Sequence, residues 1–352
     1  MKSIKQIVKS GAMMLALSLV FTSCEDILGE WSRPAPTNVA PSGDGDDTPA
    51  PEPTPNMLET PLTLEAAMAG ANVTFKANNA NVAKDIEYST DGGATWTSGN
   101  TGGDGVEVTL TNIGDKVMFR GNNIQYGKDN GSNPPSYNTI SCTADCYVYG
   151  NIMSLTDKTG FATNKVLPTG KRTFYQLFYK NTHLKNHPNA AYTLELPATT
   201  LKEYCYHSMF FGCKALVTPP TLPATTLENS CYNSMFRSCS SMVTPPALPA
   251  TELENNCYQS MFDDCTSLET TPRLPATELK YGCYYSMFKG CTSLKEAWVK
   301  ANVKVDAPDY ECDKMFEDCT NASTSQFHTG DSKANWIAQF SNLSQWQFSA
   351  YE

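Results

Sequence analysis

The pattern of apolar and polar residues repeats every 26 residues through the second half of the chain. The tetrapeptide Leu-Pro-Ala-Thr begins at Leu196, Leu222, Leu248 and Leu274, and eleven columns are identical when the four copies are aligned. One degenerate copy precedes these four units and another follows them. A period of this length is typical of a solenoid, in which each unit buries its apolar face only against its neighbours.

Within one unit, apolar residues recur at every fourth position. In the first copy they are Leu201, Cys205, Met209 and Cys213, and Phe210 widens the stripe. Since side chains four residues apart share one face of an α-helix, this spacing predicts a short helix, followed by a brief strand. The sequence therefore predicts an α+β solenoid whose units each contain one short helix and one short strand. The expected repeat core is Cys205, Met209, Phe210, Cys213, Cys231, Met235, Phe236, Cys239, Cys257, Met261, Phe262, Cys265, Cys283, Met287, Phe288 and Cys291.

Short alternating runs separated by Gly- and Asp-rich turns fill the region before the repeats. They predict a small antiparallel β-sandwich. The folded part should comprise this β-sandwich domain (59–150), an N-terminal capping region (151–195), the repeats (196–321) and a C-terminal cap (322–352). The cap should present Trp336, Ile337 and Phe340 on one helix face.

The first 58 residues are predicted to carry the protein to a membrane. Residues 1–23 combine three lysines with an apolar run of about ten residues, which predicts a lipoprotein signal peptide. Small residues before Cys24 resemble a lipobox, so we expect Cys24 to be acylated and to act as a lipid anchor. An ordinary signal peptide with an incidental Cys is the alternative. Residues 24–58 are rich in Pro and should form an extended, solvated tether.

The chain is acidic. Lys plus Arg number 26 and Asp plus Glu number 36, so the formal net charge is −10, and removal of the signal peptide would leave 23 basic residues against the same 36. Such a chain repels phosphate backbones, which argues against nucleic acid as a partner.

The repeat resembles a known family over about residues 165–320. The cadence Leu-Pro followed by Met-Phe-x-x-Cys-x-x-Leu is similar to that of the BspA-like leucine-rich-repeat surface lipoproteins of the Bacteroides group, although Cys and Met stand where the family unit has Ile and Ala. The resemblance implies a right-handed leucine-rich-repeat solenoid and a role in surface adhesion or binding. Glu25 and Asp26 resemble the export signal of such lipoproteins, which implies an outer-membrane location facing the cell exterior.

Two cysteines recur in each unit. Positions eight apart in one helix are about 12 Å apart, too far for a disulfide, whereas a secreted protein favours oxidation. Free thiols in a stacked core and disulfides between units therefore both stay open, and Cys142 with Cys146 could form a local disulfide if the chain between them turns. The absence of a tight C-x₂-C pair argues against a metal site, and no cofactor is expected.

Two aromatic features suggest carbohydrate binding at first sight. A tyrosine column could stack on sugar rings, but we expect it to pack beneath the next unit. Its members are Tyr206, Tyr232, Tyr258 and Tyr284. Residues 89–96 match the S-x-D-x-G-x-T-W Asp box of sialidases, yet the chain has one copy and Arg120 is the only arginine in that domain. We expect a hairpin turn with Trp96 as a packing residue, and no glycosidase.

The columns that differ between units are where specificity would reside. On the predicted strands, Glu269, Arg273 and Lys295 should form a charged patch and are the candidate ligand contacts. No H-E-x-x-H, G-x-S-x-G or phosphate-binding Gly motif occurs, so we expect no enzyme. The leading hypothesis is a non-catalytic binding or adhesion module for a protein or glycan ligand. The alternatives are a structural subunit or stalk component of a surface assembly, and a glycan-capture accessory of a polysaccharide-uptake system.

Overall fold

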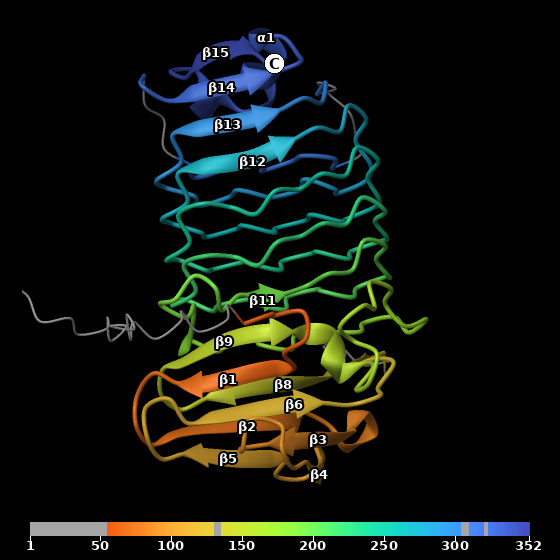
Figure 1. Cartoon of the computed structure of the whole chain (residues 1–352). Coiled ribbons are helices and arrows are strands. Elements are labelled where there is room, and N and C mark those ends of the chain that lie inside the picture. Colours follow the sequence, from red (N-terminus) through yellow and green to blue (C-terminus); the bar gives the residue numbers. More distant parts are fainter. Residues whose placement is uncertain (1–54, 130–134, 304–309, 320–322) are drawn as a thin grey trace, which may run out of the picture. The chain divides into compact units, whose positions relative to one another are not determined.

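A computed structural model of the chain describes residues 55–129, 135–303, 310–319 and 323–352. The predicted signal peptide, Cys24 and nearly all of the predicted tether lie outside the described residues. The described residues form one compact unit, with antiparallel strands at one end, stacked coils in the middle and a small cap at the other end (Figure 1). We use "coil" for one 26-residue circuit of the stack.

Two sheets form the first part of this unit. One has the strand order β9-β1-β6-β3-β4 and the other β5-β2-β8-β7, and all these pairs are antiparallel. Side chains of β2 alternate between the shared core and the surface, as the period-two pattern requires. The bounds are β1 (Leu62–Ala66), β2 (Ala71–Ala77), β3 (Asp85–Ser89), β4 (Thr97–Asn100), β5 (Val106–Leu110), β6 (Lys116–Arg120), β7 (Gly127–Lys128), β8 (Ser136–Cys142) and β9 (Cys146–Asn151), with 3-10 helices η1 (Ala80–Val82) and η2 (Ile152–Leu155).

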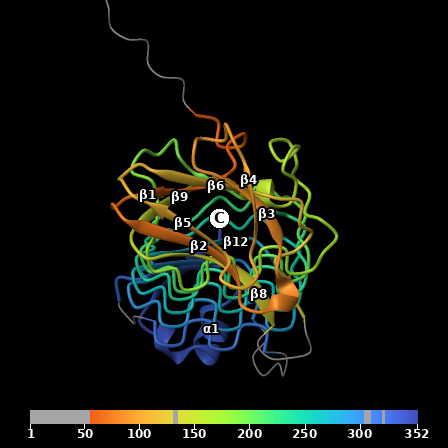
Figure 2. The same ribbon diagram turned by 90° about the horizontal axis from the view of Figure 1, so that it is seen from below.

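The coils continue directly from this β region. The short strands β10 (Leu184–Lys185) and β11 (Leu194–Glu195) pair with β9 in parallel. A column of stacked rings crosses the boundary from Tyr126 through Phe174 to Tyr206, with centroids 6.4 and 5.8 Å apart. One continuous hydrophobic core therefore joins the β region to the coils. Seen from the β end, the coils follow one another with nearly overlapping outlines (Figure 2).

The predicted helix-and-strand leucine-rich-repeat solenoid is wrong. We call one side of each coil the turn side; in the first full repeat it begins at Leu201. Along this side the backbone makes consecutive tight turns. Every fourth residue there has a left-handed φ, as at Tyr204 (56°), Ser208 (52°) and Gly212 (73°). A right-handed helix does not admit such angles, so the spacing of four arises from repeated turns. Among the described residues the single α-helix is α1 (Lys333–Gln339), which lies in the C-terminal cap and buries Trp336 as predicted.

Alternate peptide groups on the turn side bond to the next coil. The N–H groups of Tyr206, Ser208 and Phe210 donate to carbonyl oxygens 25 residues further on, over 2.8–2.9 Å. The N–H groups between them, such as that of Met209, donate to the carbonyl three residues back. On its turn side, each coil thus satisfies about half of its amides locally and half through its neighbour, which keeps successive coils in register.

Identical side chains stack on one another as a result. All sixteen residues of the expected repeat core are fully buried. Six phenylalanines from Phe178 to Phe316 stack with centroids 5.4–5.8 Å apart. The tyrosine column from Tyr206 to Tyr284 stacks likewise, at 5.7–6.3 Å, and is buried. The prediction that these tyrosines pack inside the stack is confirmed.

All twelve cysteines in the described part of the chain are buried free thiols. In the second column, the thiols of Cys239, Cys265 and Cys291 donate to a phenylalanine carbonyl of the preceding coil, at 3.1–3.2 Å. The first of these acceptors, the Phe210 carbonyl, also accepts the N–H of Cys213. Cysteine suits this column because it fills an apolar site and its thiol still supplies a weak hydrogen-bond donor to the second lone pair of the phenylalanine carbonyl oxygen. Burial raises the pKa of these thiols well above its usual range.

We call the opposite side of the coil the strand side. The positions of proline determine where this side forms a sheet. The segments starting at Val217 and Val243 each contain Pro-Pro, the third contains Pro272 alone, and the fourth, starting at Lys295, contains none. Because proline has no N–H to donate, the parallel sheet begins only with the third segment. Its strands are β12 (Thr270–Leu274), β13 (Glu296–Val299), β14 (Gln326–Thr329) and β15 (Gln347–Ala350), and η3 (Ser341–Leu343) precedes the last.

The left-handed turn positions yield a stability test. Ser260 is buried with φ at 51°. Replacing it with Val should destabilise the fold by about 2 kcal/mol or more, because a β-branched residue is strained at positive φ. Ser260→Gly should leave the unfolding midpoint unchanged or raise it. Urea unfolding of both variants, with Thr266→Val at an exposed site as control, measures this. Equal loss in Ser260→Gly and Ser260→Val would contradict the assigned backbone.

Candidate functional site

The C-terminal sheet presents a row of large polar and aromatic side chains. The register pairs Arg273 with Trp298, Trp298 with His328, and His328 with Ser349. The neighbouring residue Ala297 points into the core, so Trp298 points outward. Because paired residues of adjacent strands lie about 4.8 Å apart, the four side chains form one stack across the sheet.

Contacts within this row are close. The guanidinium carbon of Arg273 lies 3.8 Å from the ring centre of Trp298. The imidazole of His328 covers the other face of the indole, with centroids 3.5 Å apart and planes 11° apart. Tyr351 contacts the indole edge-on at 6.0 Å, and Arg273 Nη1 donates to the Glu352 carbonyl at 2.6 Å. Both faces of Trp298 are therefore occupied, and only ring edges remain available to a ligand.

A hydrogen-bonded chain fixes His328. Its Nε2 lies 3.2 Å from Glu296 Oε1, and its Nδ1 lies 2.7 Å from Ser349 Oγ. Serine, histidine and carboxylate in this order can activate a nucleophile. Acyl transfer also requires donors arranged around a developing oxyanion in a site that excludes water. Ser349 instead lies exposed on the outermost strand of the sheet. The arrangement thus orients the imidazole, and the absence of enzymatic activity stays a prediction.

The predicted ligand contacts divide into two neighbouring groups. Lys295 and Glu269 form an exposed ion pair at 2.6 Å. Arg273 does not join them, because the pairing of β12 with β13 is irregular between Thr270 and Arg273 and places the arginine on Trp298. Sequence reasoning missed Trp298 and His328. The signal was the absence of proline from the strand-side segment that starts at Lys295, which marks where the outward-facing side chains of a regular sheet begin.

Varied residues on the turn side contact one another along the stack. Arg237 lies over the ring of Phe211 at 5.6 Å and within 3.1 Å of Asp263, and Lys289 pairs with Glu317. Neighbouring coils therefore supply complementary partners, so variation in this column meets a structural need.

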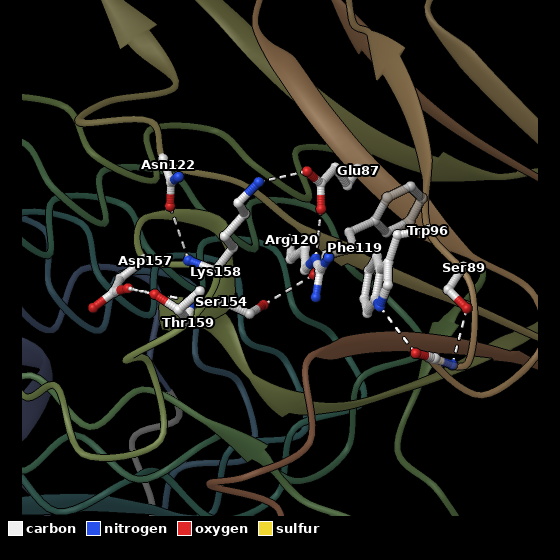
Figure 3. Close-up of polar contacts among 11 residues, drawn as sticks. Glu87, Ser89, Trp96, Phe119, Arg120, Asn122, Ser154, Asp157, Lys158 and Thr159 are labelled. Carbon is white, nitrogen blue, oxygen red and sulfur yellow. Dashed lines mark hydrogen bonds and ion pairs between the residues drawn. The ribbon is translucent and has the colours of Figure 1, made fainter.

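The Asp-box hairpin is a structural turn, as predicted. Asp91 accepts hydrogen bonds from the Thr95 amide and hydroxyl and from the Ser89 hydroxyl, at 2.5–2.9 Å, which lower its pKa to about 2. The indole N–H of Trp96 donates to the Gly93 carbonyl at 3.0 Å (Figure 3). The guanidinium of Arg120 lies 3.8 Å from the Trp96 ring centre, so Trp96 is a packing residue.

A broad groove of about 630 Å³ lies beside this hairpin. Glu87 at its wall accepts hydrogen bonds from Lys158 and Arg120, each at 2.6 Å (Figure 3). These two cations lower the pKa of Glu87 and are themselves neutralised by it. The groove therefore offers a ligand few unpaired charges.

The described residues contain no group of three or more His, Cys, Asp or Glu side chains placed to hold a metal ion. None of their helices is both long and apolar enough to cross a bilayer.

Asp263 should make stability depend on pH. Burial raises its pKa to about 6 although Arg237 is adjacent. A carboxyl whose pKa is raised on folding stabilises the fold when protonated, and that stability is lost as the pH rises through about 4 to 6. Asp263→Asn should therefore be more stable than the parent by about 1–3 kcal/mol at pH 8 and equal to it near pH 3.5. Thermal unfolding across this range measures the difference. The exposed neighbour gives the control Asp264→Asn, and a parent curve that is flat from pH 4 to 7 would contradict the assignment.

The chain was compared with protein-family models, curated proteins and solved structures. No family model matches it, and neither of the other two comparisons yields a match.

Proposed function

We propose that this protein is a non-catalytic binding module and that the C-terminal sheet of its repeat stack contacts a protein ligand. The observation that carries the proposal is the outward-facing row Arg273–Trp298–His328, in which Arg273 is exposed and the two rings are half-buried, beside the exposed ion pair Glu269–Lys295. Tryptophan and arginine are the residues that most often dominate binding energy at protein interfaces. Here they are held rigid before binding, which lowers the entropy cost of association.

The geometry favours a protein over a glycan at this surface. A sugar ring packs on the open face of an aromatic ring, and both faces of Trp298 are covered by Arg273 and His328. The tyrosine column, the other candidate for sugar stacking, is buried. The neighbouring segments of the strand side add the exposed apolar side chains of Val217 and Val243. An apolar surface beside a mixed-charge, aromatic one is typical of a protein-binding face.

We also propose that Cys24 anchors the protein by lipid in the outer membrane, with the folded part facing the cell exterior. The support is the sequence pattern described above. The Pro-rich residues 24–58 would hold the binding face away from the lipid surface.

Reversing the charges beside Trp298 should weaken ligand capture. A photo-crosslinking residue placed at position 295 identifies the ligand on intact cells. Glu269→Lys, Arg273→Glu and Lys295→Glu combined should then lower its affinity about tenfold or more, with a reduced dependence on salt. The control Lys214→Glu changes the net charge equally at an exposed site on the turn side. If the triple variant binds normally while deletion of residues 60–150 abolishes binding, the β region is the receptor and the proposal fails.

Removal of Cys24 should release the protein from the membrane. After expression of Cys24→Ala, cell fractionation should find the protein outside the membrane fraction, because a single cysteine carries all the acyl chains. The parent protein should stay in the outer membrane and be digested by protease added to intact cells. An unchanged membrane fraction in Cys24→Ala would refute the anchor.

A further inference from the structure

The boundary between the β region and the first full coil contains a second, more enclosed cavity of about 460 Å³. Its walls come from three segments: Val148 on β9, the loop 186–193 between β10 and β11, and the proline-containing segment 218–221. Both ends of the loop are tied to β9, because Leu184 pairs with Cys146 and Leu194 with Gly150. The cavity is therefore formed by segments far apart in sequence and within the size range of small-ligand sites.

One wall is aromatic and held from behind. His187 and Tyr192 line the cavity with ring centroids 4.4 Å apart. Tyr149 meets both rings edge-on, at 5.8 and 5.0 Å, and donates its hydroxyl to Glu65 at 2.7 Å. Lys116 pairs with Glu65 at 3.3 Å. The supporting polar groups are thus satisfied, and the two rings are fixed before any ligand arrives.

The opposite wall is apolar and equally fixed. Pro219, Pro220 and Leu216 contribute to it. Asn186 holds this segment through three hydrogen bonds: its Oδ1 accepts the amides of residues 217 and 218, at 3.0 and 2.8 Å, and its Nδ2 donates to the Thr218 carbonyl at 2.7 Å. The asparagine side chain thereby pairs with the segment much as a neighbouring strand would.

Polar groups between the two walls are acceptors and hydroxyls. Glu195 Oε1 accepts the Thr193 hydroxyl at 2.5 Å, and Glu195 Oε2 has no hydrogen-bond partner among the described residues. Thr218 and Thr221 also line the space. Neither lysine nor arginine is among the lining residues in the described part of the chain. The nearest cation is Lys116, whose Nζ lies 5.9 Å from the ring centre of Tyr192 and is paired with Glu65. The Glu195 carboxylate therefore disfavours an anionic ligand, and one carboxylate is too few ligands for a divalent metal.

We infer that this cavity binds a neutral sugar unit. The apolar C–H face of a pyranose would pack against Tyr192 and the proline wall, and its hydroxyls would donate to Glu195 and exchange hydrogen bonds with the threonines. This site goes beyond the protein-binding function proposed above and is independent of it.

Saturation-transfer NMR with maltose, cellobiose, xylobiose and mannobiose tests the inference, with N-acetylneuraminic acid and galacturonic acid as acidic probes. At least one neutral disaccharide should give transfer, and calorimetry should find its affinity lowered about tenfold by Tyr192→Ala and by Glu195→Gln. Glu195→Gln conserves the shape of the side chain, so it separates loss of binding from loss of folding. Tyr281→Ala and Glu254→Gln, at exposed sites on the stack, are the matched controls.

The outcomes keep the two proposals distinguishable. Normal sugar binding by the Glu269, Arg273 and Lys295 triple variant, together with loss of binding in the two cavity variants, would place the sugar in the cavity and leave the sheet face to its own test. The inference is overturned if no neutral sugar gives transfer, if binding survives both cavity variants, or if the acidic sugars bind more tightly.

Discussion

The rest of the structure depends on the hydrogen bond between each alternate turn-side amide and the equivalent peptide group of the next coil. This bond allows no slip between coils, so on the turn side of the four full repeats each side chain stacks on the residue 26 positions away. Phenylalanine, tyrosine and cysteine tolerate a copy of themselves as a neighbour, and they fill the invariant columns. Like charges repel in the same position, which explains why the varied column joins Arg237 to Asp263 and Lys289 to Glu317.

The sequence predicted which side chains are buried better than it predicted the backbone conformation. The period, the buried repeat core and the burial of Trp336 in the cap follow from apolar spacing, and the antiparallel strands of the β region follow from its short alternating runs. The helix was wrong because a spacing of four fits both a helix and a run of four-residue turns. The left-handed positions hold mostly Ser, Gly, Asn and Asp, as at Ser260 and Asp264, and these are poor helix formers that tolerate positive φ.

The candidate sites were only partly predictable, for related reasons. Glu269 and Lys295 could be paired because they are one period apart. The displacement of Arg273 onto Trp298 depends on a local irregularity in strand pairing that a strict 26-residue alignment hides. The boundary cavity depends on a loop whose two ends pair with β9, and the 26-residue repeat gives no indication of this pairing. Both proposed binding sites therefore lie where the repeat is broken.

The uniform direction of the turn-side bonds makes the stack electrically polar. Peptide dipoles alternate along the strand side and cancel, whereas those on the turn side point the same way in every coil and add, as they do in a helix. Carbonyl oxygens face the β region, where the amides of Tyr126, Gly127 and Ile140 donate to the carbonyls of Thr173, Arg172 and Leu177. The β region thus pairs the carbonyl groups at the negative end of a long dipole, and each further repeat would lengthen that dipole without adding to the terminal carbonyls that such a structure must pair.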